Sequence, residues 1–530
     1  MRLHRRLSAT LFALVLTTSA AFASDPLKIK TDKGSVDGTY TTDKQVRIFK
    51  GIPYAAPPVG NLRWAPPQPA TKWFGTLAAK DFGHHCYQTN PFNDMVFPDP
   101  GPSEDCLNLN IWSPAKAKPG SLPVMVWIHG GGYTAGSASE PRHDGQFLAH
   151  RNVVVVTLNY RLGIFGFFTH PDLAAESPHH AAGNYGLLDQ AAALAWVSRN
   201  IMAFGGDPNN ITVFGESAGS FSVSSLMASP LSKTLIAKAI GESGAAFHSS
   251  GLTYPTLAKT EQDDAAFAQT AFNASTIADL RKVSADDLVK AAGAHTTPPP
   301  PRFGPVVDGY FLPESVPEIY AAGNQAHVPL LAGWNADEVR AMITMSPVKP
   351  TVDTFSAQAT KDFGTRSADF LAVYPATTDA EAVQSAGDFV SDRFIAYSTW
   401  AWLEAQVKTG QAPVYRYRFD LAAPGDKFHP AATGAFHSDD IEYVFGTLDS
   451  RQQATIRPED RALSDQIQKY WTNFARNGDP NSPTLPTWPT YGPTNDWQVM
   501  HLNTTSQAQP DTQRNRYLFL DSVWSKPVAP

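Results

Sequence analysis

Two short segments of the sequence contain a serine that follows Gly-Glu: Ser217 in "VFGESAG" and Ser243 in "AIGESGA". A nucleophilic serine needs an exposed hydroxyl, and a glycine two residues before and two residues after it allows the sharp strand-to-helix turn that exposes it. The first segment has both glycines, Gly215 and Gly219, whereas the second has Ala245 at the later position. The pattern therefore predicts that Ser217 is a nucleophile.

A glycine-rich stretch, "HGGGY", follows the apolar run "VMVWI". Glycines let backbone N–H groups approach a substrate, and such groups stabilise the oxyanion that forms when a serine attacks an ester carbonyl. Removing one donor of this kind typically lowers the rate by about 10²–10³-fold. Three glycines also suit a plain tight turn. With "GESAG" downstream, we expect the oxyanion donors to be the N–H groups of Gly131, Gly132 and Ala218.

A serine nucleophile also needs a histidine as its base and a carboxylate that orients the histidine. In hydrolases with these two motifs, the order along the chain is serine, acid, histidine. Residue types and spacing leave many carboxylates open as the acid. They also leave several histidines after Ser217 open as the base: His248, His295, His327, His429 and His437.

These residues need a scaffold that brings distant segments together. Near-continuous apolar runs are typical of strands that are buried on both faces of a parallel sheet. We predict such strands at Val124–His129, Val153–Leu158, Ile211–Gly215, Ala237–Ser243 and Val328–Gly333. Tyr185–Ile201 has apolar residues at helical spacing, and the alternation of strands and helices predicts a parallel α/β sheet.

The N-terminal part of the chain has a different pattern. "LKIKTDKGSVDGTY" and "QVRIFKG" predict antiparallel hairpins with glycine turns. Further along, the proline-rich stretch His295–Pro305 is predicted to be a surface loop, because the strand–helix alternation resumes after it.

The first residues have the composition of a targeting segment. "MRLHRR" is basic, "LSATLFALVLTTSAAF" is apolar, and small residues at Ala21–Ala23 suit cleavage. We interpret residues 1–23 as a secretory signal peptide that is cut after Ala23, which implies a secreted or periplasmic protein. A membrane anchor is disfavoured, because a spanning helix needs about 20 apolar residues and this run is short and contains Ser and Thr.

The composition indicates a globular protein. The 530 residues are 42% hydrophobic and 17% charged, with a net charge of -7. No strong basic stripe occurs, so the sequence gives no reason to expect a nucleic-acid partner. The two cysteines, Cys86 and Cys106, are predicted to form a disulfide in an exported chain, with two free buried thiols as the alternative.

Several blocks of the sequence resemble the type-B carboxylesterases, the α/β-hydrolase family that includes the cholinesterases. "FGGDPNNITVFGESAG" is similar to the family's serine signature. "EDCLNLNIWSP" is similar to its cysteine signature except at Asn108, where an aromatic residue or Thr is usual. "FKGIPYAAPPVGNLRW", "VVVTLNYRLGIFGF" and "NYGLLDQ" also occur in the family's order. The likeness runs from Leu27 to Trp524. It implies an α/β-hydrolase fold in a single domain, residues 24–530, with a large, mixed, mostly parallel sheet flanked by helices and a small N-terminal antiparallel sheet.

The resemblance also implies the residues that spacing leaves open. "LLAGWNADEV" is similar to the block with the acid of the triad and implies Glu338, with Asp337 beside it as the rival. "GAFHSDDIEYVFG" is similar to the histidine block and implies His437. Ser243 corresponds to a serine that lies behind the triad in relatives, so we expect it to hydrogen-bond Glu338 or to be a plain packed serine.

Further family features concern structure. The resemblance implies that Cys86–Cys106 is the family's first disulfide, and that Arg63 with Glu104 and Arg161 with Asp189 are structural ion pairs.

The expected function is hydrolysis of a small-molecule carboxylic ester through Ser217, Glu338 and His437 and an acyl-enzyme, without a metal or cofactor. Activity is expected to fall as the pH drops through the pKa of His437, about 6.5 for an unperturbed imidazole. The alternatives are a catalytically silent binding protein and an amidase or peptidase with the same triad. Choline esters are disfavoured because no Trp lies between the two cysteines. Lipase, xenobiotic esterase, and toxin or polyester hydrolase remain as substrate classes.

Overall fold

The computed structural model describes residues 26–89, 91–248 and 253–524. The predicted signal peptide, residues 1–23, lies outside the described residues. None of the helices within the described ranges combines the length and the apolar character that a membrane crossing requires.

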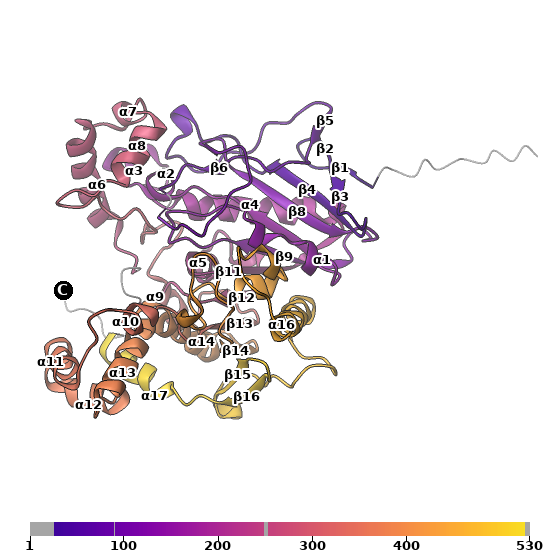
Figure 1. The fold of residues 1–530 in the computed structure, drawn as a ribbon. Helices are drawn as coiled ribbons and strands as arrows, with labels where there is room; N and C mark the ends of the chain where they lie inside the picture. Colours follow the sequence, from indigo (N-terminus) through magenta and orange to yellow (C-terminus); the bar gives the residue numbers. More distant parts are fainter. Residues whose placement is uncertain (1–25, 90, 249–252, 525–530) are drawn as a thin grey trace, which may run out of the picture.

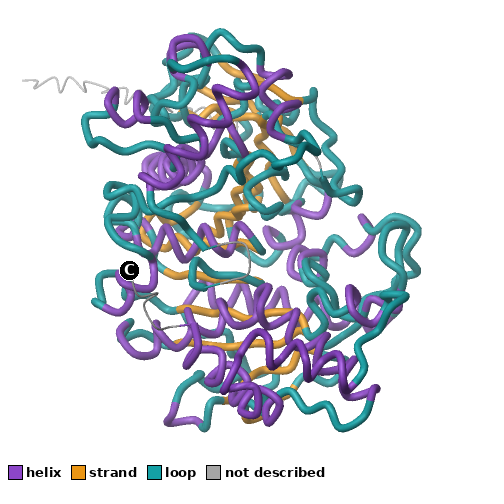
Figure 2. The backbone as a smooth tube through the Cα atoms, turned by 90° about the vertical axis from the view of Figure 1, so that its left-hand side faces the viewer, coloured by secondary structure: helices purple, strands orange, loops and turns teal. Residues whose placement is uncertain are grey.

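An eleven-stranded sheet runs through the centre of the molecule, with helices on both sides (Figures 1 and 2). The strand order is β16-β15-β14-β13-β12-β11-β9-β10-β8-β4-β3. The pairs from β10 to β15 are parallel, and the pairs at both ends of the sheet are antiparallel. The strands are β3 (Thr39–Tyr40), β4 (Val46–Pro53), β8 (Asn108–Pro114), β9 (Leu122–Ile128), β10 (Val154–Leu158), β11 (Gly206–Glu216), β12 (Lys238–Glu242), β13 (Leu330–Asn335), β14 (Val414–Phe419), β15 (Gln498–Leu502) and β16 (Gln507–Pro510).

Each face of this sheet has its own apolar core, because successive side chains of a strand point to opposite faces. In β9, Val124, Val126 and Ile128 belong to one core, and Met125 and Trp127 belong to the other. The first core includes α4 (Tyr185–Asn200), α5 (Ala218–Ala228) and α14 (Tyr397–Thr409). The second includes α1 (Gln146–Ala149), α15 (Ile441–Phe445) and α16 (Pro458–Asn477). Burial on both faces explains why the central strands are almost entirely apolar.

Other helices lie outside the sheet in two groups, seen in Figure 1 at the upper left (α3, α6–α8) and the lower left (α10–α13 and α17). The bounds of the remaining helices are α2 (Gly163–Phe167), α3 (Pro171–Glu176), α6 (Leu257–Phe272), α7 (Ile277–Leu280), α8 (Ala285–Ala292), α9 (Val316–Ala321), α10 (Ala341–Thr344), α11 (Val352–Phe363), α12 (Ser367–Val373), α13 (Asp379–Ser391) and α17 (Arg514–Trp524).

The secondary-structure predictions are confirmed, with shifted ends. The five predicted buried strands are β9, β10, β11, β12 and β13, and the predicted helix is α4. Strand β11 starts earlier than predicted, at Gly206, and its pairing with β9 is irregular before Ile211. The stretch His295–Pro305 is a loop whose first half is exposed, as predicted.

The N-terminal hairpins also form. β1 (Lys28–Lys30) pairs antiparallel with β2 (Ser35–Asp37), and β3 pairs antiparallel with β4. A third strand that was not predicted, β5 (Thr76–Ala78), joins β2 in parallel and completes a small separate sheet. A two-stranded sheet, β6 (His85–Cys86) and β7 (Pro102–Ser103), closes the disulfide loop. Because one sheet takes strands from Thr39 to Pro510, we propose that residues 24–530 form a single domain.

Candidate active site

The two Gly-Glu-Ser segments end neighbouring parallel strands in the same register. Glu216 of β11 lies opposite Glu242 of β12, so Ser217 and Ser243 leave the sheet at the same edge. Ser217 has φ 52° and ψ -122°, and its N–H donates to the carbonyl oxygen of Glu242 at 2.9 Å. Such a strained, positive-φ turn raises the serine above the strand end, directly before helix α5.

The two glycines of "GESAG" are required by close backbone contacts. A Cβ atom on Gly219 would lie 2.0 Å from the carbonyl oxygen of Ile128, and one on Gly215 would lie 2.6 Å from the same oxygen. Helix α5 therefore starts in direct contact with the end of β9. The second segment does not need a glycine at the position of Ala245, because no helix begins directly after Ser243.

Three side chains from distant segments form one hydrogen-bonded chain. Nε2 of His437 lies 2.9 Å from Oγ of Ser217, and Nδ1 of His437 lies 2.7 Å from Oε2 of Glu338. His437 is separated from Ser217 by 220 residues and from Glu338 by 99. Ser217 and Glu338 are 8% and 2% exposed, whereas 22% of the His437 side chain is exposed. The histidine is thus the member of this group with the most access to solvent.

Backbone and side-chain contacts fix the carboxylate. Oε1 of Glu338 accepts hydrogen bonds from the hydroxyl of Ser243 at 2.7 Å and from the N–H of Asn335 at 2.8 Å. The N–H of His437 donates to the carbonyl oxygen of Glu338 at 2.9 Å, and the side chain of Asn335 donates to the carbonyl oxygen of Phe436 at 2.7 Å. The loops that carry the acid and the histidine are therefore tied together. Ser243 has the contact that the family resemblance implies.

The rival residues have other partners. Asp337 accepts a hydrogen bond from the N–H of Ala435 and pairs with Arg340 at 2.8 Å. The ring of His429 stacks on Phe436, and the ring of His248 stacks on Trp524. His327 bonds a backbone carbonyl, and His295 is exposed. Among the described histidines that the sequence leaves open, His437 is the one whose ring is bonded to Ser217.

The carboxylate of Glu216 contacts Nε2 of His437, the ring nitrogen that also contacts Ser217. Oε1 of Glu216 lies 3.3 Å from Nε2 of His437 and, within the described residues, has no hydrogen-bond partner. Burial lowers the pKa of His437, but the carboxylates of Glu216, Glu338 and Asp440 outweigh burial and raise the pKa to about 9. Burial is also the main cause that raises the pKa of Glu216 to about 8. The ordinary imidazole value of about 6.5 therefore does not hold, because this pair retains a proton to higher pH.

Glu216 is a residue that the sequence reasoning missed, although it stands inside the quoted motif. The sequence contained a signal for Glu216, because this residue ends a predicted buried strand and directly precedes Ser217. A carboxylate at such a strand end lies at the edge where the other site residues meet.

Within the described residues, backbone N–H groups of the glycine loop have no hydrogen-bond acceptor. Gly131 and Gly132 have φ of 98° and 64°, and a Cβ atom on Gly131 would lie 2.2 Å from the carbonyl oxygen of Ala135. Among the hydrogen bonds of the described residues, none has its donor at the N–H of Gly131, Gly132 or Ala218. These three N–H groups are therefore available to an acceptor from outside the protein.

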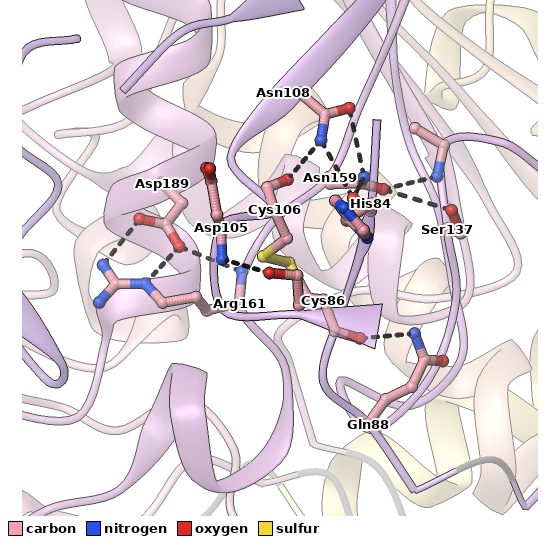
Figure 3. The surroundings of a disulfide bond; sticks show 12 residues. His84, Cys86, Gln88, Asp105, Cys106, Asn108, Ser137, Asn159, Arg161 and Asp189 are labelled. Atoms are coloured by element: carbon pink, nitrogen blue, oxygen red, sulfur yellow. Dashed lines mark hydrogen bonds and ion pairs between the residues drawn. A yellow bond between two sulfur atoms is a disulfide. The ribbon is translucent and has the colours of Figure 1, made fainter. Parts of the chain in front are cut away.

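The predicted disulfide is confirmed (Figure 3). Its loop contacts the glycine loop. Cys86 bonds Cys106, and the side-chain amide of Gln88 exchanges two hydrogen bonds with the backbone of Gly136, at 2.8 and 3.0 Å. Cε of Met95, in the same disulfide loop, lies 3.2 Å from the position of a Cβ on Gly131. The disulfide loop thus forms one wall beside the glycines.

Both predicted ion pairs are present. Arg63 pairs with Glu104 at 2.5 Å, and the buried Arg161 pairs with Asp189 at 2.7 Å through two hydrogen bonds (Figure 3). Burying these charges is tolerated because each guanidinium meets a carboxylate in a bidentate arrangement.

Known proteins resemble this chain along most of its length. A family model described as "Carboxylesterase family" matches residues 25–520. The chain is 38% identical to the fumonisin B1 esterase of Sphingopyxis macrogoltabida over 488 residues, which cover 89% of this chain and 86% of the relative. It is also 38% identical to the para-nitrobenzyl esterase of Bacillus subtilis (strain 168) over 505 residues, which cover 93% and 98%.

A solved structure of a PNB esterase superposes with a TM-score of 0.80 at 36% identity, covering 93% of this chain and 99% of that one. Fold and sequence therefore agree along nearly the whole length. The chain belongs to the carboxylesterase family, with the α/β-hydrolase fold, and is a carboxylic ester hydrolase.

Proposed function

We propose that Ser217 is the nucleophile of this esterase, that His437 is its general base, and that Glu338 orients the histidine. The observation that carries the proposal is the continuous hydrogen-bonded chain from Oγ of Ser217 through both ring nitrogens of His437 to Oε2 of Glu338. The N–H groups of Gly131, Gly132 and Ala218 are the proposed oxyanion donors.

Acylation starts when Oγ of Ser217 attacks the ester carbonyl. Nε2 of His437 takes the hydroxyl proton. The carboxylate of Glu338 stabilises the imidazolium that forms, because it accepts a hydrogen bond from the Nδ1–H group. The carbonyl oxygen gains negative charge, and the three unpaired N–H groups stabilise it in a fixed geometry. His437 then gives its proton to the leaving alcohol, and an acyl-serine remains.

Deacylation repeats these steps with water as the nucleophile. His437 takes a proton from water, which attacks the acyl carbonyl, and the histidine then returns a proton to Ser217. The bonds of Ser243 and Asn335 to Oε1 of Glu338 hold the carboxylate in one orientation throughout both halves. Ser243 is thus proposed as a positioning residue.

Replacement of the nucleophile tests the proposal. Ser217→Ala is expected to lose hydrolysis of para-nitrophenyl butyrate and to lose labelling by a fluorophosphonate probe, with an unchanged circular dichroism spectrum. Ser220→Ala is the control, since Ser220 is a nearby buried serine in α5 whose hydroxyl donates to the carbonyl oxygen of Gly244. Wild-type turnover in a folded Ser217→Ala protein would contradict the proposal.

We also propose that residues 1–23 are a signal peptide and that the mature protein is secreted or periplasmic. The basic and apolar composition of this segment and the small residues before Ser24 support the proposal. Mass spectrometry of the exported protein should find an N-terminus at Ser24, and an exported protein that retains Met1 would contradict it.

A further inference from the structure

The acid of the proposed triad lies in a strained segment of backbone. Glu338 has a φ of 26°, a positive value that residues with a side chain rarely adopt. Such a conformation is unfavourable and persists only where surrounding contacts enforce it. The charged residues on either side of Glu338 in the chain are Asp337 and Arg340. Their contacts therefore show what holds the acid in place.

Asp337 ties the acid segment to the histidine segment. Its N–H donates to the carbonyl oxygen of Ala435 at 2.9 Å, and its Oδ2 accepts from the N–H of Ala435 at 2.9 Å. Ala435 is buried and lies two residues before His437. A Cβ atom on the neighbouring Gly434 would lie 2.2 Å from Oδ2 of Asp337, so this close approach requires a glycine. The orientation of the Asp337 carboxylate thus acts on the backbone that carries His437.

Arg340 holds the other oxygen of the same carboxylate. Nη1 of Arg340 pairs with Oδ1 of Asp337 at 2.8 Å, and Nη2 pairs with Asp388 of α13. A Cβ atom on Gly387 would lie 2.6 Å from Cγ of Arg340, so a glycine in α13 makes room for the arginine stem. The three charged side chains are 15–21% exposed, so water screens these pairs less than it screens surface pairs. One planar guanidinium therefore joins two carboxylates in a fixed geometry.

The C-terminal helix anchors the far end of this ionic chain. Oδ2 of Asp388 pairs with Nη1 of Arg516, in α17, at 2.8 Å. Arg516 also pairs with the buried Asp392, directly after α13, at 2.9 Å. Figure 1 shows α13 and α17 in the same group of helices at the lower left. Arg340 is thus held by packed helices and not by a loose surface side chain.

We propose that Arg340 is a positioning residue for the ester hydrolysis and acts through Asp337. By fixing that carboxylate, the guanidinium keeps the acid and histidine segments in one mutual orientation. Without it, the carboxylate can turn away from the histidine segment, and the strained backbone of Glu338 can relax. The 2.7 Å contact between Glu338 and His437 then forms in fewer molecules. This inference rests on the proposed function of Ser217.

The proposal predicts that Arg340→Gln lowers kcat for para-nitrophenyl butyrate about tenfold, with KM little changed. A misplacement of about 1 Å that starts far from the chemistry can lower the rate about 10²-fold, and a partial loss of support should have a smaller effect. A fall in kcat at constant KM indicates that the reacting groups, and not substrate binding, are affected. Arg340→Lys should recover part of kcat, because a cation remains between the two carboxylates. Labelling by a fluorophosphonate probe, carried to completion, counts the reactive serines, so that kcat excludes unfolded protein.

A double variant tests whether Asp388 acts through Arg340. Asp388→Asn alone should lower kcat, because the amide loses the charge that holds the guanidinium. In a protein that already has Arg340→Gln, the same change should lower kcat no further, since the group that transmits the effect is absent. A double variant whose loss equals the product of the two single losses would overturn this path.

Arg514→Gln is the matched control. Arg514 lies in α17, its side chain is 17% exposed, and it pairs with Glu404 of α14, away from the acid segment. It should lower stability in urea unfolding and leave kcat at the wild-type value. An unchanged kcat in Arg340→Gln would overturn the proposal, and so would an equal fall in Arg514→Gln, which would show that kcat follows stability alone. The proposed function fails by a different sign, namely turnover of the same ester by a folded Ser217→Ala protein, so the two failures are distinguishable.

Discussion

Oε1 of Glu216 lies 3.3 Å from Nε2 of His437, the same ring nitrogen that contacts Ser217. Only an unprotonated Nε2 can take the serine proton, so each carboxylate that stabilises the imidazolium also delays the appearance of the active base as the pH rises. The geometry thus links Glu216, the residue before the proposed nucleophile, to the pH dependence of the proposed reaction.

The first prediction concerns the pH profile of the wild-type enzyme. The carboxylates of Glu216, Glu338 and Asp440 outweigh burial and raise the pKa of His437 to about 9. The acidic limb of kcat/KM for a neutral ester should therefore have its midpoint on the alkaline side of the ordinary imidazole value of about 6.5. A profile measured from pH 5 to 10 checks this, and a midpoint at or below the ordinary value would show that the carboxylates do not act as described.

The second prediction concerns Glu216→Gln. Of the three carboxylates, Glu216 raises the pKa of His437 most. Its removal should therefore move the midpoint of the acidic limb to lower pH by about one unit. Glu242→Gln is the matched control, because Glu242 lies at the same register on the neighbouring strand but bonds the indole N–H of Trp471 at 2.7 Å. Equal shifts in both variants would point to a general loss of negative charge rather than to the contact with His437.

The third prediction concerns Ser243→Ala. Loss of its hydroxyl leaves Oε1 of Glu338 with one donor, the N–H of Asn335, so the carboxylate is held less firmly beneath His437. Loss of a buried hydrogen bond to a charged group is expected to lower the rate about tenfold. We expect kcat to fall by that factor, with KM little changed. An unchanged kcat in a folded variant would make Ser243 a plain packed serine.

The fourth prediction compares Gly131 and Gly132 of the proposed oxyanion loop. Alanine at Gly131 would combine a φ of 98° with a Cβ 2.2 Å from the carbonyl oxygen of Ala135, whereas alanine at Gly132 would have a φ of 64° and its nearest recorded atom at 3.7 Å. Gly132→Ala should therefore lower stability by about 1 kcal/mol, the usual penalty of the left-handed region. Gly131→Ala should lower it more and should reduce activity further. Thermal unfolding and kcat/KM of both variants test the order, and the reverse order would contradict it.

The fifth prediction concerns the disulfide loop. Cys86 and Cys106 are 20 residues apart, and a bridge over such a loop removes about 3 kcal/mol of unfolded-state entropy in the loop-closure account. The double variant Cys86→Ser with Cys106→Ser should lose about that much stability in urea unfolding. Activity should also fall, because Gln88 and Met95 in this loop contact the glycine loop. A variant as stable as the wild type would show that the surrounding contacts alone hold the loop.

Much of the scaffold is predictable from local pattern. The apolar runs give β9 to β13 because a strand buried on both faces must be apolar throughout, and the glycines of "GESAG" and "HGGGY" mark turns where no side chain fits. The parallel strand β5 is not predictable in this way, because it is short and mostly exposed and pairs with residues 41 positions earlier in the chain. The choice of Glu338 and His437 came from family resemblance, since neighbouring residues such as Asp337 have the same chemistry.

The sequence by itself determined the type of chemistry: a serine at a strand-to-helix turn, glycines beside it, and an alternation of strands and helices that makes a parallel sheet. These features are local, and local backbone geometry and side-chain periodicity account for them. Only the tertiary structure decided which carboxylates surround His437, because these distances join residues from separate strands and loops. A pKa depends on the charges within a few ångströms of a group, and folding alone sets those neighbours.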